Sequence, residues 1–140
     1  QGYSSAASDV YKRQPDTWRK RAEHYYEENS RVKEGIKAWK IGNIEKFGQL
    51  IFESGRSSIY KYETGSEELK VLQEIMQSTD GIYGGRFSGA GFNGSSMAII
   101  DPDKKEEIEN FVRTKYVKKF PDLEDKFSVH FCKTANGVTI

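Results

Sequence analysis

The sequence predicts an α+β fold in which antiparallel strands lie under packed helices. Helical patterns of apolar residues fill the first half of the chain, a glycine-rich loop between two β-prone runs follows residue 80, and alternating apolar residues return after residue 126. The chain has 140 residues, of which 36% are hydrophobic and 31% charged. These proportions fit one soluble domain with a modest core.

Residues 1–14 are set apart from the rest of the chain. They show no periodicity, and the segment from Ser8 to Gln14 resembles translated adapter sequence. They also lack the apolar centre of a signal peptide. We therefore expect a non-native or disordered leader over residues 1–14 and take residues 15–140 as the domain.

The charge and the reactive side chains exclude several classes of protein. The net charge of +1 gives no indication of a nucleic-acid partner, and no apolar run is long enough to span a membrane. A single cysteine, Cys132, excludes an internal disulfide. His24 and His130 are far apart without ligand spacing, so we expect no metal site. These features fit a reducing, cytoplasmic setting.

The stretch from Thr17 to Lys40 carries apolar residues at helical spacing, which predicts one long amphipathic helix. We expect its apolar stripe to lie in the core rather than to form a ligand platform. The stripe consists of Trp18, Ala22, Tyr25, Val32, Ile36 and Trp39. His24 has no visible catalytic partner, so we expect it to be a surface or packing residue.

A second helix is predicted directly after the first. Gly42 is expected to end the first helix and Asn43 to cap the second. The apolar face of the second helix comprises Ile44, Phe47, Leu50, Ile51 and Ile59. Arg56, Ser57 and Ser58 lie late in this helix and are expected to be exposed to solvent, the alternative being that they line a cleft.

A third helix, two strands and a fourth helix follow. Ser66 is expected to cap the third helix. The apolar face of that helix is Leu69, Leu72, Ile75 and Met76. Strands are predicted on both sides of the glycine-rich loop, over Ile82–Phe87 and up to Ile100, and Asp101 and Pro102 are expected to open the fourth helix. The apolar face of the fourth helix is Ile108, Phe111, Val112 and Tyr116.

The end of the chain has a strand pattern. Apolar residues alternate with polar ones from Phe127 to Cys132, which predicts a last strand with one buried face. Asn136 and Gly137 are typical of a turn, and a short edge strand is expected over Val138–Ile140. The predicted order is thus helices followed by β-loop-β-α-β.

The glycine-rich loop is the candidate functional segment. Its Gly89-x-Gly91-x-x-Gly94 spacing matches the letters of the dinucleotide fingerprint, which requires a helix after the loop, but here a short apolar run ends at Ile100. A P-loop is excluded because no Gly-Lys-Ser/Thr follows. Either the glycines let main chain lie close to a ligand or another loop, or they form a plain hairpin connection. Arg86 beside the loop is either an internal cation of a site or part of a structural ion pair.

Four further observations carry a resemblance to a known family. Residues 85–94 read Gly-Arg-Phe-Ser-Gly-Ala-Gly-Phe-Asn-Gly, and family-like segments also occur at residues 21–32, 42–54 and 135–138. Together they resemble, in the same order, the C-terminal half of the galactokinase branch of the GHMP sugar and metabolite kinases. The Tyr-Glu-x-Gly-Ser-Glu-x-Leu pattern of residues 62–69 looks more like the galacturonate-type kinases of this superfamily.

The resemblance implies that residues 15–140 are the ferredoxin-like C-terminal domain of an ATP-dependent sugar 1-kinase. Such an enzyme phosphorylates galacturonate or galactose at the anomeric hydroxyl, with ATP and Mg²⁺ held mainly by an N-terminal half of the same chain. In this family the catalytic residues also lie in that half. The resemblance therefore implies no catalytic residue and no metal ligand here, and an inactive chain in isolation.

The resemblance also implies that this chain contributes one wall of the sugar and nucleotide cleft. The wall residues are Arg86, Ser88, Gly89, Ala90, Gly91, Phe92, Asn93 and Gly94. Asn93 stands where the family has Gly, which indicates a left-handed backbone position that Asn tolerates. The expected partners are the sugar and the N-terminal domain, without nucleic acid or membrane. The alternative hypothesis is a stand-alone regulatory domain that binds a small ligand on a ferredoxin-like sheet.

Overall fold

The computed structural model of the protein describes residues 15–92 and 94–135. Helices pack on a small antiparallel sheet, so the predicted α+β fold class is confirmed. The expectations for the leader over residues 1–14, for Asn93, and for the turn and edge strand in residues 136–140 lie outside the described residues.

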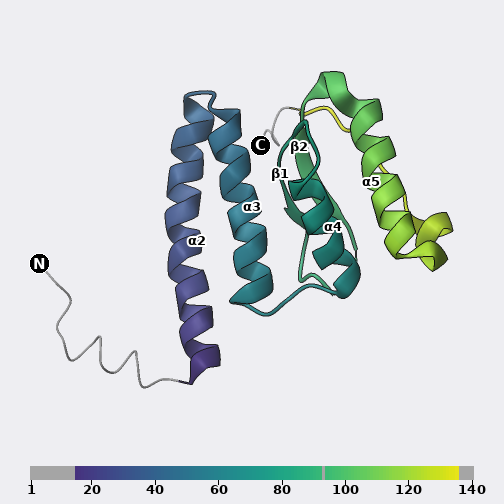
Figure 1. The fold of residues 1–140 in the computed structure, drawn as a ribbon. Coiled ribbons are helices and arrows are strands. Elements are labelled where there is room, and N and C mark those ends of the chain that lie inside the picture. Colours follow the sequence, from purple (N-terminus) through teal and green to yellow (C-terminus); the bar gives the residue numbers. More distant parts are fainter. Residues whose placement is uncertain (1–14, 93, 136–140) are drawn as a thin grey trace, which may run out of the picture.

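Two helices lie on one flank of the sheet, and α4 (Glu67–Gln77) and the last helix lie on the other (Figure 1). The first two, α2 (Asp16–Lys40) and α3 (Ile44–Tyr60), form a pair joined by a short turn. β1 (Ile82–Phe87) lies next to α3 and pairs antiparallel with β2 (Ser96–Ile100), and α5 (Lys105–Lys119) lies on the opposite flank. The order of elements therefore places the glycine loop at one end of the sheet, between β1 and β2.

The helix ends follow the local signals in the sequence. Gly42 has φ +71° at the turn after α2, and the Asn43 side chain accepts a hydrogen bond from the Lys46 N–H at 2.9 Å. Ser66 caps α4 (Glu67–Gln77) in the same way. These predicted caps are confirmed, because a cap depends on residues that are neighbours in the sequence.

The main core lies between α4, the sheet and α5. It contains Ile75, Ile108, Val112 and Tyr116. Phe87 and Gln73 are the most deeply buried large side chains, and Gln73 Nε2 donates to the Gly85 carbonyl at 2.9 Å. Phe111 was expected on the buried face of α5 but is 40% exposed, because only residues spaced four apart on that helix face α4.

The apolar stripe of α2 is not buried, so this prediction is wrong. Its large side chains remain between 51% and 64% exposed. They are Trp18, Tyr25, Val32, Ile36 and Trp39. The buried residues of α2 are the small Gly35 and Ala38. The reason is that α3 is the element packed along α2, and one neighbouring helix covers only a narrow strip of its surface.

α3 contacts its neighbours mainly through small side chains. Its buried residues are Gly48, Leu50, Ser54, Gly55, Ser57 and Ser58. Of the predicted apolar face only Leu50 is buried, while Ser57 and Ser58, expected to be exposed, retain 6% and 4% exposure. The cause is a close approach between α3 and β1, since a Cβ on Gly48 would lie 2.1 Å from the Tyr83 carbonyl oxygen.

The strand predicted over Phe127–Cys132 is not formed, and in the described part of the chain the sheet has two strands. Phe127 follows the 3-10 helix η2 (Pro121–Lys126) and stacks on Tyr116 of α5 with ring centroids 4.7 Å apart. Half-buried and exposed side chains do alternate from Phe127 to His130. The alternation therefore reflects the burial of one face of this segment, although the segment does not pair with the sheet.

Replacement of Gly48 by Ala is expected to destabilise the fold by about 2 kcal/mol or more, because the new methyl group meets main chain that cannot rotate away. Gly35→Ala in α2 is the matched control. Its Cβ would lie 3.4 Å from the Phe47 ring, an ordinary contact, so it is expected to be neutral or to stabilise by up to about 1 kcal/mol. Urea unfolding measures both, and equal effects would contradict the close approach of α3 to β1.

Candidate functional site

The glycine loop presents main chain to solvent. Its base is closed by a hydrogen bond from the Ser88 N–H to the Ser95 carbonyl at 2.8 Å. Gly89 has φ +78°, and a Cβ there would meet no heavy atom within 4 Å. The exposed residues of the loop include Ser88, Gly89, Ala90, Phe92 and Gly94. A strand follows the loop, so the helix that a dinucleotide fingerprint requires is absent.

Gly91 has a different environment from Gly89. It is buried, and its carbonyl accepts a hydrogen bond from the Ser66 N–H at 2.6 Å. A Cβ on Gly91 would lie 2.6 Å from the Phe87 ring and 3.0 Å from the Gly65 nitrogen. The structure thus joins the glycine loop to the segment that precedes α4. The loop is fixed at Gly91 and open at Gly89.

Arg86, near the end of β1, is held by α2 and α3. Its guanidinium donates to Ser54 Oγ and, at 3.2 Å, to Ser58 Oγ. Glu28 Oε2 lies 3.8 Å from the guanidinium and accepts a hydrogen bond from Ser54 Oγ at 2.7 Å. These contacts match a structural ion pair that holds β1 one residue before the strand ends.

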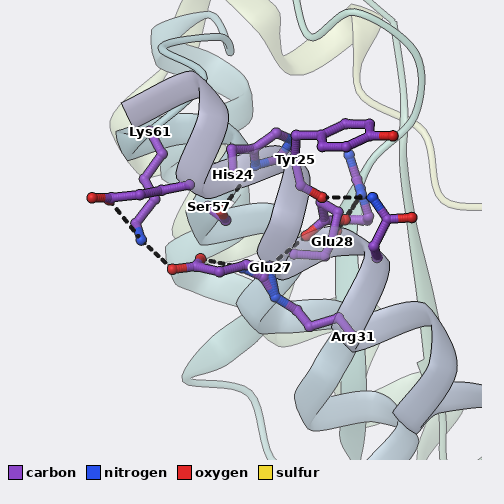
Figure 2. Close-up of polar contacts among 11 residues, drawn as sticks. His24, Tyr25, Glu27, Glu28, Arg31, Ser57 and Lys61 are labelled. Carbon is purple, nitrogen blue, oxygen red and sulfur yellow. Dashed lines mark hydrogen bonds and ion pairs between the residues drawn. The ribbon is translucent and has the colours of Figure 1, made fainter. Parts of the chain in front are cut away.

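Acidic residues of α2 extend this network towards the far end of α3 (Figure 2). Arg31 pairs with Glu27 at 2.7 Å and also with Glu28, and Lys61, directly after α3, pairs with Glu27. Burial raises the pKa of Glu27, but hydrogen bonds from Lys61 and Arg31 outweigh it and leave that pKa below its usual value. The network therefore keeps Glu27 ionised at neutral pH.

His24 packs within the same helix interface, as expected for a packing residue. Its Nδ1 lies 2.9 Å from Ser57 Oγ (Figure 2). Its ring centroid is 5.2 Å from that of Tyr62. Burial is the main cause that lowers the pKa of His24, while the charge of Glu28 opposes the shift. Neutral imidazole is therefore favoured in the folded protein.

Sequence reasoning missed the residues that hold Arg86 and His24. Ser54, Ser57 and Ser58 lie three and four positions apart, so they share one face of a helix. Gly48 and Gly55 are buried on another side of this helix, where Gly48 meets β1 and Gly55 meets Gln73 of α4. A run of small residues at helical spacing was thus a signal for close helix packing. The partner, Arg86, was not visible because it follows 28 to 32 residues later.

The described residues do not by themselves fit an ATP or Mg²⁺ site. Within residues 15–92 and 94–135 no group of three or more His, Cys, Asp or Glu side chains is placed to hold a metal ion. The glycine loop leads into β2 and offers no helix N-terminus to phosphate. Across the same residues, no helix combines the length and the apolar character needed to cross a membrane.

Comparison with known proteins identifies the family. The family described as GHMP kinases C terminal matches residues 32–118, more than half of the chain. The chain belongs to the GHMP kinase family. It is 47% identical over 109 residues to a galacturonokinase of Arabidopsis thaliana and 30% identical over 136 residues to a galactokinase of Thermotoga neapolitana. A crystal structure of Lactococcus lactis galactokinase complexed with galactose matches with a TM-score of 0.74 at 35% identity.

The chain spans only part of these GHMP kinases. The matches cover 78% of this chain and 26% of the Arabidopsis protein, and 97% of this chain and 38% of the Thermotoga protein. The structural match covers 78% of this chain and 28% of the Lactococcus one. The resemblance found in the sequence is therefore confirmed, and the chain corresponds to the C-terminal domain of sugar kinases.

Replacement of Arg86 by Met is expected to destabilise the domain by about 1–3 kcal/mol, because Ser54 and Glu28 lose a charged partner. Arg86→Lys restores the charge but not the planar fork that reaches both serines, so an intermediate value is expected. Lys118→Met, at an exposed position of α5, is the control. Urea unfolding measures all three, and a loss from Arg86→Met no larger than from Lys118→Met would contradict the anchoring role.

The lowered pKa of His24 predicts a pH dependence of stability. The unfolded chain binds a proton at His24 near pH 6.5 and the folded chain only at lower pH, so the free energy of unfolding falls as pH drops below 6.5. The Glu27 carboxylate acts in a separate window, below its usual pKa of 4.5. His24→Gln is expected to remove the first component only. The free energy of unfolding is measured from pH 4 to 8 for both proteins. The same pH dependence in this variant as in the unchanged chain would contradict the assignment.

Proposed function

We propose that this chain is the C-terminal part of an ATP-dependent sugar 1-kinase that phosphorylates galacturonate or galactose at the anomeric hydroxyl. Membership of the GHMP kinases and the similarity to galactokinases support a sugar kinase. The 47% identity to a galacturonokinase supports galacturonate as the first substrate to test. ATP and Mg²⁺ are assigned mainly to an N-terminal half of the same polypeptide, and Cys132, a free thiol, suits the cytoplasm.

The glycine loop is proposed as one wall of the sugar and nucleotide cleft. The observation that carries this proposal is a loop fixed at Gly91 and beside Arg86, yet bare at Gly89. Phosphoryl transfer depends mainly on positioning and charge stabilisation, so a rigid loop with accessible main chain suits a cleft wall. The wall would run from Arg86 through Ser88 and Ala90 to Gly94.

The test uses a hybrid kinase, in which residues 15–135 of this chain replace the corresponding region of the Arabidopsis galacturonokinase. We expect the hybrid kinase to transfer phosphate from ATP to galacturonate or galactose, and the 140-residue chain alone to transfer none. Gly89→Val is expected to lower kcat/KM about 100-fold by displacing the loop. Gly42→Val is the matched control, because Gly42 has a similar positive φ and equally open surroundings far from the loop.

Comparable turnover of the Gly89→Val and Gly42→Val hybrids would contradict the role of the loop. A folded hybrid that phosphorylates neither sugar would contradict the kinase assignment. Tight binding of either sugar by the 140-residue chain alone would instead favour the regulatory-domain alternative.

A further inference from the structure

The exposed apolar residues of α2 follow a heptad pattern. Trp18, Tyr25, Val32 and Trp39 are spaced seven residues apart, and Ala22, Asn29 and Ile36 follow the first three of them by four residues. We call these seven residues the heptad seam. Such spacing places side chains along one face of a helix, here over about 30 Å at 1.5 Å per residue. The exposure of its large side chains means that no described part of the chain covers the seam.

The C-terminal half of the heptad seam borders an apolar groove of about 600 Å³ between α2, α3 and β2. Val32, Ile36 and Trp39 form one side of it, and Phe47 of α3 and Ile99 of β2 contribute to the other. The three seam residues remain 59%, 51% and 57% exposed. Water therefore contacts a continuous apolar surface, and its burial under a partner is favourable in proportion to the area covered.

The polar end of the groove has little charge to offer a ligand. It is lined by Glu28, Arg31 and Arg86, which are already joined in ion pairs, and by Ser54, which bonds to two of them. Lys40, beside Trp39 at the end of α2, also lines the groove but lies outside this polar end. A charged ligand at the polar end would have to break the pairs there. An apolar helix surface can cover the groove without doing so, because the pairs stay intact at its edge.

We propose that the heptad seam and its groove bind an α-helix from the remaining part of the same kinase polypeptide. This inference rests on the proposed function. The aligned region is 26% of the Arabidopsis galacturonokinase and 38% of the Thermotoga galactokinase, so most of such an enzyme lies outside the described domain. A heptad pattern fits a helix as the occupant, because side chains at its positions insert between those of a facing helix. Asn29 within the seam fixes the register of that helix.

A tethered helix is favoured over a second copy of the chain by effective concentration. Two segments joined in one polypeptide by a short flexible linker meet at a local concentration in the millimolar range. Separate copies of the chain in dilute solution do not reach this value. The tethered segment therefore occupies the seam first, and self-association through it is confined to the isolated chain.

The bound helix would also contact the residues that hold the glycine loop. Arg86 and Ser54 line the same groove and anchor the end of β1. Covering them removes water from the ion pairs with Glu28, which strengthens those pairs. Docking at the heptad seam thus helps to fix the position of the loop relative to the rest of the enzyme.

Hydroxyl-radical footprinting read by mass spectrometry tests the docking directly. We expect Trp18 and Trp39 to be oxidised several-fold more slowly in the hybrid kinase than in the 140-residue chain. Phe111 on α5, which is 40% exposed, is the internal control and is expected to react equally in both. A second comparison uses the hybrid kinase alone, with the oxidation rate of each residue divided by that of the free amino acid. The normalised rate of Trp39 should be lower than that of Phe111, although Trp39 is the more exposed of the two in the described domain.

The outcomes separate this inference from the proposed function. Protection of both tryptophans in a hybrid without kinase activity would support docking and refute the function, whereas full reactivity in an active hybrid would refute docking alone. Protection in the isolated chain that rises with its concentration would identify a second copy as the occupant and overturn the proposal.

A pair of variants of the hybrid kinase gives a second readout. Ile36→Glu places a charge under the docked helix and is expected to lower Tm by several degrees. Ser30→Glu introduces the same side chain on α2 at an exposed position outside the heptad seam and is expected to leave Tm unchanged. Equal Tm values for the two variants would overturn the proposal, whatever the activity of either.

Discussion

The contact between the main chains of α3 and β1 sets the geometry on which the rest of this structure depends. The two backbones lie so close that a Cβ on Gly48 would fall 2.1 Å from the Tyr83 carbonyl oxygen, and a Cβ on Gly84 would fall 2.2 Å from the Gly48 carbonyl oxygen. The buried side of α3 carries serines rather than large apolar side chains. At this short distance the serines lie within reach of Arg86. Polar groups at such an interface must find partners in the protein, because water is excluded from them. The network of Ser54, Ser58 and Glu28 supplies those partners.

The same contact explains why the glycine loop can be well positioned and still uncovered. Three attachments fix it, namely the two paired strands, the anchor at Arg86 and the hydrogen bond from Ser66 to Gly91. Between these attachments no side chain covers the main chain at Gly89. Rigid elements beside an accessible backbone are what a phosphoryl-transfer cleft requires from a supporting wall. A loop with larger residues would lose either the tie at Gly91 or the opening at Gly89.

Close packing through small residues leaves the large apolar side chains of α2 beside the contact uncovered. Because α2 meets α3 through Gly35 and Ala38, its large apolar residues are directed elsewhere and remain in water. A surface helix of an independent domain normally turns such a stripe towards its own core. Here the core lies between α4, the sheet and α5, and α2 is remote from it. This uncovered stripe is the surface on which we propose that a helix of further polypeptide docks, and the chain spans 26% and 38% of the two GHMP kinase relatives.

The sequence by itself determined the features that depend on neighbouring residues. The extents of α2, α3 and α4, the caps at Asn43 and Ser66, β1 and the glycine loop were all predictable, because capping, turn chemistry and helical periodicity act over a few positions. The family was also predictable, because its motifs are local strings of residues.

Only the tertiary structure decided which faces are buried and which pattern becomes a strand. The aromatic stripe of α2 and the alternating residues after Phe127 have the patterns of a buried helix face and a sheet strand, yet the first is exposed and the second is unpaired in the described chain. A periodic pattern indicates that one face is apolar but does not indicate which element packs against that face. That is decided by which elements approach, and here the approach is controlled by Gly48, Gly84 and the serines of α3, whose partners are distant in the sequence.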